Sequence, residues 1–273
     1  MELHLGNGSF TEVEAQNGLL EGGANVDLLT VAAVEQRVFF FGSWKNVLVF
    51  VTDARKYSRF GSTKQDRSKS AVAVTNSGTL YACGCTTRGV CSYTCDVLNY
   101  GWTAWKTVVV EEKAKEGFCG LLPSAAALGR RIYIAGGSCG RASRAATVYD
   151  ASANEWSRLS PMVTGRVLHS MSAFNGSVIA CGGLSASRGA IRSCERYDPA
   201  QSEWFPMRGT LPDDFCNGSL LAFNGTLYAI GSNSRSCNKH WKIFELDSLD
   251  GFWRPSPVQL ETTNVGQISG AVV

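Results

Sequence analysis

Residues 132–156 read IYIAGGSCGRASRAATVYDASANEW, and residues 178–204 read VIACGGLSASRGAIRSCERYDPAQSEW. In both stretches an apolar run ends in two glycines, and a Tyr-Asp pair and then a tryptophan follow in the same order. A single copy would fit a turn beside a strand. Two copies predict a repeated structural unit, and a repeat decides the fold of the whole chain.

The pattern extends along the 273 residues as three columns. The aromatic column, with steps of about 50 residues, contains Phe10, Phe60, Trp105, Trp156, Trp204 and Trp253. Seven residues earlier lie Leu98, Tyr149, Tyr197 and Leu246, each followed by Asn or Asp. The glycine column contains Gly42, Gly84, Gly136 with Gly137, Gly182 with Gly183, and Gly231.

The sequence pattern of each unit predicts four short strands. Apolar, β-branched and aromatic runs such as RIYIAGG precede the glycines, and tight turns such as those in AFNGSV and AFNGTL lead into these runs. Four strands in about 50 residues is the size of one blade of a propeller.

The units resemble kelch repeats, in which two glycines, Tyr-Asp and Trp follow in this order. The units ending at Trp156 and Trp204 match fully, those ending at Trp105 and Trp253 carry Gly-Cys and Gly-Ser instead of the double glycine, and the unit ending at Phe60 matches weakly. The resemblance implies an all-β kelch β-propeller. We expect the glycines to lie near the crowded axis and each tryptophan to pack against the neighbouring blade.

The count of units predicts a ring of about six blades in one domain, residues 1–273. Five complete four-stranded units run from about Thr11 to Pro257, and the N-terminal segment around Phe10 and the C-terminal GQISGAVV contribute strands to one shared, incomplete blade.

The net charge of +3 gives no strong attraction to nucleic acid or to a membrane. The most apolar window, residues 38–51, is too short to span a bilayer, and the N-terminus lacks the pattern of a signal peptide. We therefore expect a cytoplasmic protein with ten reduced cysteines.

The cysteines at 83, 85, 91 and 95 are close enough in sequence to consider zinc, but their spacing is not CxxC. Cys83 and Cys181 occupy one repeat position, and Cys95 and Cys194 another, which favours small core residues over metal ligands. We expect no metal and no cofactor.

His4, His169 and His240 lie in different units, so they do not form the copper site of a galactose-oxidase type of enzyme. We therefore expect no catalytic residues. Four Asn-Gly-Ser/Thr sequons, at Asn7, Asn175, Asn217 and Asn224, are interpreted as Asn-Gly turns of hairpins.

Basic residues recur in the loops on one face of the predicted ring. The loops after the glycines carry Arg88, Arg141, Arg144, Arg188 and Arg235, and the loops that enter the first strands add Lys69 and Arg166. One interpretation is solvated loop charge. The other is a basic ring that binds an acidic peptide of a protein partner, because guanidinium groups pair bidentately with carboxylates; Asp213 and Asp214 interrupt this ring.

The stretch RSCERYDPAQSEWFPM most resembles the kelch-like (BTB-kelch) adaptors of cullin-3 RING ubiquitin ligases. In that family the propeller holds the substrate protein, whereas BTB and BACK domains, which this chain does not contain, dimerise and bind cullin-3. The resemblance implies a non-catalytic substrate-recognition module. The alternatives are an actin-binding cytoskeletal kelch protein and, third, a propeller oxidase or lyase.

Overall fold

The computed structural model describes residues 2–3, 10–11, 30–34, 36–41, 45–51, 53–54, 56–65, 67, 70–84, 93–99, 101, 104–117, 121–186, 189–232 and 241–257. They form five antiparallel four-stranded sheets, named here blades 1 to 5 in chain order. Blade 1 contains β3 (Thr30–Val34), β4 (Arg37–Phe41), β5 (Asn46–Val51) and β6 (Lys56–Ser62). Blade 2 contains β7 (Ala71–Val74), β8 (Leu80–Cys83), β9 (Thr94–Leu98) and β10 (Lys106–Val109).

Blade 3 contains β11 (Ser124–Leu128), β12 (Arg131–Ala135), β13 (Ala146–Asp150) and β14 (Glu155–Arg158). Blade 4 contains β15 (Ser170–Phe174), β16 (Ser177–Cys181), β19 (Cys194–Asp198) and β20 (Glu203–Pro206), with the hairpin β17 (Leu184–Ser185) and β18 (Gly189–Ala190) inserted between its second and third strands. Blade 5 contains β21 (Cys216–Phe223), β22 (Thr226–Ser232), β23 (Trp241–Leu246) and β24 (Arg254–Pro255).

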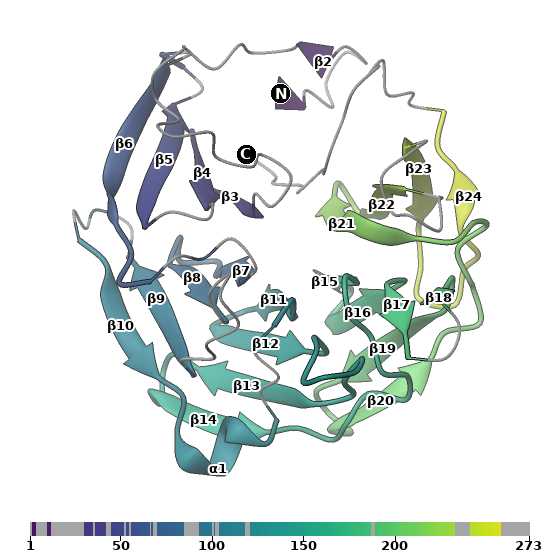
Figure 1. Cartoon of the computed structure of the whole chain (residues 1–273). Coiled ribbons are helices and arrows are strands. Elements are labelled where there is room, and N and C mark those ends of the chain that lie inside the picture. The colour runs from purple at the N-terminus through teal and green to yellow at the C-terminus, as the bar shows by residue number, and fades with distance from the viewer. Residues whose placement is uncertain are drawn as a thin grey trace.

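The five blades follow one another around a central axis, with β3, β7, β11, β15 and β21 innermost (Figure 1). The all-β propeller expected from the sequence is therefore confirmed. A separate two-stranded sheet pairs β1 (Glu2–Leu3) with β2 (Phe10–Thr11), and β2 lies between blades 1 and 5. The pair lies where the repeat count predicts a sixth, shared blade, and the five blades detected are roughly consistent with a count of about six.

The Tyr-Asp…Trp pattern corresponds to a hairpin of the third and fourth strands, in which the Tyr and the Trp pair across the strands and the Asp begins the turn. Tyr149 and Trp156 lie directly opposite each other on β13 and β14, with ring centroids 4.9 Å apart, and Tyr197 and Trp204 repeat the pair at 5.3 Å. The Asp150 carboxylate accepts hydrogen bonds from two backbone N–H groups of the intervening turn. The spacing of seven residues follows from the geometry of this hairpin.

The tryptophans lie in the hydrophobic clusters that join neighbouring blades. Trp156 shares a cluster with Tyr81 of blade 2, and Trp204 shares one with Tyr133 of blade 3. Trp253 shares a cluster with Ile179 of blade 4, and Trp105 contacts Phe41 of blade 1. Each of these tryptophans thus packs toward the preceding blade.

The double glycines lie where one blade touches the segment that enters the next. The Gly137 N–H donates to the Arg166 carbonyl over 2.8 Å, and the Gly183 N–H donates to the Phe215 carbonyl over 2.7 Å. Gly136 has a φ of +69°, and a Cβ at this position would lie 2.6 Å from the Arg166 carbonyl oxygen. The close approach is therefore a contact between blades, which only glycine permits.

The cysteines differ from the expectation of reduced thiols. Cys83 and Cys95 face each other on β8 and β9 and form a buried disulfide, and Cys181 and Cys194 do the same on β16 and β19. Cys139 and Cys216 are also disulfide-bonded, and no cysteine of the described residues is free. The repeat-equivalent placement was predicted correctly, but its physical basis is covalent pairing across adjacent strands.

The one helix in the described ranges, α1 (Glu112–Lys115), is a single turn between blades 2 and 3, and it buries Ala114 in the cluster of Trp156. No helix in this part of the chain is long and apolar enough to cross a membrane.

Candidate binding face

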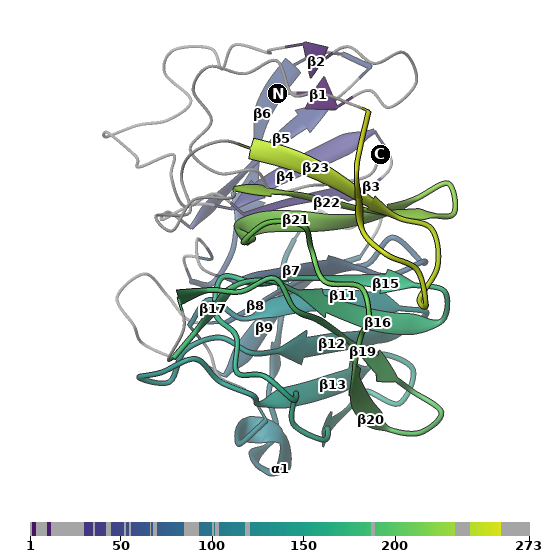
Figure 2. The same cartoon turned by 90° about the vertical axis from the view of Figure 1, so that its right-hand side faces the viewer.

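The candidate site is the face of the propeller formed by the loops after the second strands and the segments that enter the first strands. We call it the binding face. In Figure 2 it lies on the side of β17, opposite the β15–β16 and β21–β22 turns. Since loops on a rigid scaffold commonly carry binding residues, this face is where a protein partner is first sought.

Arg141 and Arg144 lie on the binding face, in the loop between β12 and β13, and both are exposed. The loop is anchored by isolated bridges from Ser138 to Leu121 and Ala142, and from Ser143 to Arg166. The Arg144 Nε–H donates to the Met162 carbonyl, which holds this side chain along the surface. Neither arginine pairs with a carboxylate of the described residues.

Arg166 is not part of an exposed ring, so that prediction is wrong for this residue. Its side chain is 1% exposed, and its Nε lies 2.8 Å from Glu195 Oε1. Its Nη1 donates to the carbonyls of Gly182 and Ser193 over 2.8 and 2.7 Å. The guanidinium thereby ties the segment entering blade 4 to strands β16 and β19. Burial lowers its pKa, and the charge of Glu195 opposes this shift.

Arg67 forms the same arrangement in blade 2, although the sequence pattern did not single it out. Its Nε lies 2.9 Å from Asp96 Oδ2, and its Nη1 donates to the Gly84 carbonyl over 2.8 Å. Arg67 and Arg166 each stand four residues before the strand residue that pairs with the disulfide cysteine, Ala71 or Ser170. An alignment of the repeats that places Ala71 opposite Ser170 would have shown that Arg67 and Arg166 are equivalent.

The other four predicted ring residues lie outside the described residues: Lys69, Arg88, Arg188 and Arg235. Asp213 and Asp214, which interrupt the predicted basic ring, belong to the described residues, and each forms an ion pair with a nearby basic side chain. Asp213 lies 2.5 Å from Lys242 Nζ, and Asp214 lies 3.2 Å from Arg192 Nε. Because both carboxylates have cationic partners, they do not cancel the charge of Arg141 and Arg144.

The histidine that the structure describes, His169, does not provide a metal site. It is buried, and its ring nitrogens have no hydrogen-bond partner among the described residues. Burial, with a smaller contribution from Arg166, lowers its pKa to about 3. No group of three or more metal-binding side chains occurs in the described ranges, and Cys83 and Cys95 are consumed by their disulfide. Cys85, Cys91, His4 and His240 lie outside those ranges.

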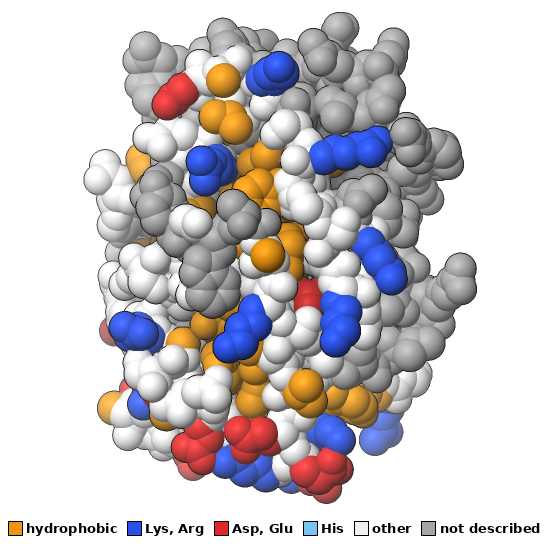
Figure 3. Space-filling model, turned by 90° about the vertical axis from the view of Figure 1, so that its left-hand side faces the viewer, with side chains coloured by type: hydrophobic (Ala, Val, Ile, Leu, Met, Phe, Trp, Pro, Cys, Tyr) orange, Lys and Arg blue, Asp and Glu red, His pale blue; other side chains and the backbone are white. Residues whose placement is uncertain are grey.

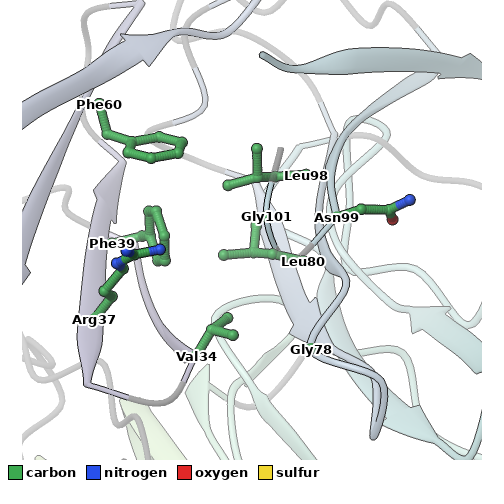
Figure 4. Close-up of a pocket in the computed structure, with 9 residues that line it drawn as sticks. All are labelled: Val34, Arg37, Phe39, Phe60, Gly78, Leu80, Leu98, Asn99 and Gly101. Atoms are coloured by element: carbon green, nitrogen blue, oxygen red, sulfur yellow. The ribbon is translucent and has the colours of Figure 1, made fainter. Parts of the chain in front are cut away.

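A pocket opens between blades 1 and 2, on the face opposite the binding face. It is lined by Val34, Arg37, Phe39, Phe60, Gly78, Leu80, Leu98, Asn99 and Gly101 (Figure 4). Figure 4 shows Leu80 and Leu98 of blade 2 facing Phe39 and Phe60 of blade 1 across the pocket.

The pocket lies where two other blades place a tyrosine. Leu98 has the register position of Tyr149 and Tyr197. Tyr149 packs against Tyr81 of the preceding blade at 5.7 Å, and Tyr197 packs against Tyr133 at 5.6 Å. Leucine is shorter than tyrosine, so the space between blades 1 and 2 is left partly unfilled.

The outer side of blades 1 and 2 carries dispersed Lys and Arg side chains among apolar and uncharged surface, and acidic side chains gather toward the end where α1 lies (Figure 3). Among the described residues on this side, the Lys and Arg side chains are dispersed and do not gather into one basic patch.

A family model described as "Kelch motif" matches residues 120–163 and 165–208. Kelch-like protein 35 of Mus musculus is 33% identical over 127 residues, which cover 46% of this chain and 21% of that protein. Kelch-like protein 25 of Xenopus tropicalis is 28% identical over 140 residues, covering 48% of this chain and 24% of that protein. The chain thus covers only about a fifth to a quarter of the length of these relatives.

The solved structure of YjhT superposes with a TM-score of 0.69 at 12% identity, covering 83% of both chains. At this identity the likeness shows the fold alone. Together these findings show that the chain is a kelch-repeat propeller related to Kelch-like proteins.

Proposed function

We propose that this chain is a non-catalytic protein-binding propeller that holds an acidic segment of its partner on the binding face, with Arg141 and Arg144 as contacts. The observation that carries the proposal is the pair of exposed arginines on one anchored loop, without carboxylate partners among the described residues. By contrast, Arg192 and Lys242 on the same face are already paired with acidic residues.

The chemistry of the guanidinium group supports this assignment. It remains charged at physiological pH and presents parallel N–H donors that match both oxygens of a carboxylate. The loop is fixed at its base, so little conformational entropy is lost when a partner binds. A contact of this kind at the centre of an interface contributes about 2 kcal/mol or more.

The test is affinity capture of partners from the organism's own cells, followed by mass spectrometry, with the full-length protein as bait. Arg141→Glu with Arg144→Glu should reduce recovery of the specific partner at least tenfold, since a charge reversal replaces attraction with repulsion. The matched control is Lys56→Glu with Lys106→Glu, which changes the net charge equally on the exposed outer strands β6 and β10. Equal recovery with both pairs of variants contradicts the proposal.

The Kelch-like relatives support a finer proposal, in which the propeller is the substrate-recognition part of a cullin-3 RING ubiquitin-ligase adaptor. That role requires BTB and BACK domains in the same protein and a cytoplasmic location. Thiols are normally reduced in the cytosol, so the buried disulfides oppose this setting. Co-precipitation of cullin-3 with the full-length protein supports the ligase role, and its absence, together with oxidised cysteines, refutes it.

A further inference from the structure

Two sequons of the chain lie on equivalent exposed turns. Asn175 and Gly176 form the turn between β15 and β16, and Asn224 and Gly225 form the turn between β21 and β22. Both asparagines are exposed and have a positive φ, 46° and 50°. No hydrogen bond of either side-chain amide to another described residue is found, so both amide nitrogens are open to a substituent.

The turn geometry explains the Asn-Gly pairs but not the complete sequons. A two-residue hairpin turn of this type needs positive φ at both positions, which Asn-Gly supplies. It sets no requirement for a hydroxyl on the following residue. That position carries Ser177 in blade 4 and Thr226 in blade 5, which completes the sequon for N-linked glycosylation in both.

The disulfides provide an independent observation. The pairs Cys83–Cys95 and Cys181–Cys194 are buried in two separate blades, and Cys139 and Cys216 are also disulfide-bonded. Disulfides form and persist in oxidising compartments such as the secretory pathway and the extracellular space. N-linked glycans occur on Asn-x-Ser/Thr sequons in surface loops of secreted proteins. The oxidised cysteines and the exposed sequons therefore indicate the same compartment.

We propose that Asn175 and Asn224 carry N-linked glycans, in a disulfide-bonded chain that resides in an oxidising compartment. The co-reactant is a lipid-diphosphate-linked oligosaccharide, presented by a glycosyltransferase of that compartment. A bond forms between Nδ2 of the asparagine and the anomeric carbon of the first sugar, while the bond from that carbon to the diphosphate oxygen breaks. The amide loses one proton, and the lipid diphosphate leaves.

The position of the two turns is compatible with binding on the other face. Both lie on the side of the propeller opposite β17 and the binding face (Figure 2). Glycans there would cover the turn face of blades 4 and 5 and leave Arg141 and Arg144 accessible. This inference does not depend on the proposed function, and it would exclude only the cytoplasmic ligase role.

The test uses the full-length protein purified from its natural source. The protein is unfolded in denaturant, alkylated without reduction, and then treated with a peptide N-glycosidase in ¹⁸O-labelled water, which converts each glycosylated asparagine to labelled aspartate. We expect label at both residues 175 and 224 and no alkylation of the cysteines at 83, 95, 181 and 194. Unlabelled asparagine at both sequons, or alkylation of all four cysteines, overturns the proposal.

Sequon variants produced in the same cells give the matched control. Thr226→Val and Ser177→Ala each abolish one sequon but keep the Asn-Gly turn, and each should remove one glycan-dependent step of gel mobility. Thr226→Ser keeps the sequon and should keep the step. Should Ser177→Ala impair folding because Ser177 is buried, Asn175→Gly retains the positive φ and removes the same site. Unchanged gel mobility of every variant also overturns the proposal. Partner capture through Arg141 and Arg144 is a separate measurement, so failure of one proposal does not imply failure of the other.

Discussion

The Arg166 guanidinium lies 2.8 Å from the Glu195 carboxylate in the interior of the propeller, and the two side chains are 1% and 2% exposed. Arg67 and Asp96 form the equivalent pair two blades earlier at 2.9 Å. In both pairs the arginine also binds backbone carbonyls at the end of the second strand. The pairs therefore connect the segment that enters a blade with the strands of that blade.

Replacement of Arg166 by methionine should lower the free energy of unfolding by about 3–5 kcal/mol, because the Glu195 charge would remain buried without its partner. Urea unfolding followed by tryptophan fluorescence measures the loss. Arg141→Met is the matched control on the exposed loop, and it should change stability by less than about 0.5 kcal/mol. Equal stability of the two variants would show that the buried pair contributes nothing.

Replacement of Trp204 by alanine should lower stability by about 3–5 kcal/mol, because the side chain is buried between blades 3 and 4. The control is Phe252→Ala, since Phe252 is 75% exposed and loses little on truncation. Thermal unfolding of both variants distinguishes them. A similar shift of the melting temperature for both would contradict the role of Trp204 as a contact between blades.

The fold was predictable because its determinants are local and repeated. The spacing of Tyr149 and Trp156 reflects one hairpin, and that of Gly136 and Gly137 one close contact between blades. Because each blade contacts mainly its neighbours, four such residues per unit suffice to identify the architecture.

The chemistry of single side chains was less predictable. Arg141 and Arg166 both fit the pattern of basic residues in the loops. The sequence does not show that Arg166 lies in the interior, where it pairs with Glu195. Likewise, equivalent positions for Cys83 and Cys181 fit thiols and disulfides equally well. The decisive fact is that each faces a second cysteine on the adjacent strand, which depends on the register of pairing.

Leu98→Tyr should raise stability by about 0.5–2 kcal/mol by filling the pocket between blades 1 and 2. The tyrosine would take the place that Tyr149 occupies in blade 3. The reciprocal control, Tyr149→Leu, should open a similar space and cost about 2 kcal/mol. Chemical denaturation of both variants gives the comparison, and a destabilised Leu98→Tyr would show that the pocket does not accept the ring.

Cys181→Ala with Cys194→Ala should lower stability by about 3 kcal/mol, because the unfolded chain loses a cross-link that closes a loop of 13 residues. The alanines reproduce the Ala135 and Ala146 pair at the same position of blade 3, so the strands can pair as before. Unfolding is measured with and without a thiol reductant under denaturing conditions. The difference between wild type and variant should shrink with the reductant; a difference that is the same in both conditions would contradict a contribution from this disulfide.

The stability of the protein should fall as the pH drops below about 6.5, partly because of His169. In the folded chain burial lowers the pKa of His169 to about 3, and the positive charge of Arg166 contributes to this shift. The unfolded chain takes up the proton near pH 6.5, whereas the folded chain excludes it, so the contribution of His169 to stability is complete above pH 6.5 and decreases down to about pH 3.

Between pH 7 and pH 5 the loss due to this residue should be about 2 kcal/mol, at about 1.4 kcal/mol per unit of pH below 6.5. His169→Leu removes the titrating group and should flatten the pH dependence by that amount, whatever its effect on absolute stability. His4 and His240 are present in both proteins, so their titration cancels in the difference. Urea unfolding at pH 7, 6 and 5 gives the two curves. Parallel curves would mean that His169 is protonated in the folded chain as readily as in the unfolded chain. The buried site of the imidazole, which lies against Gly136, would then accept the charge.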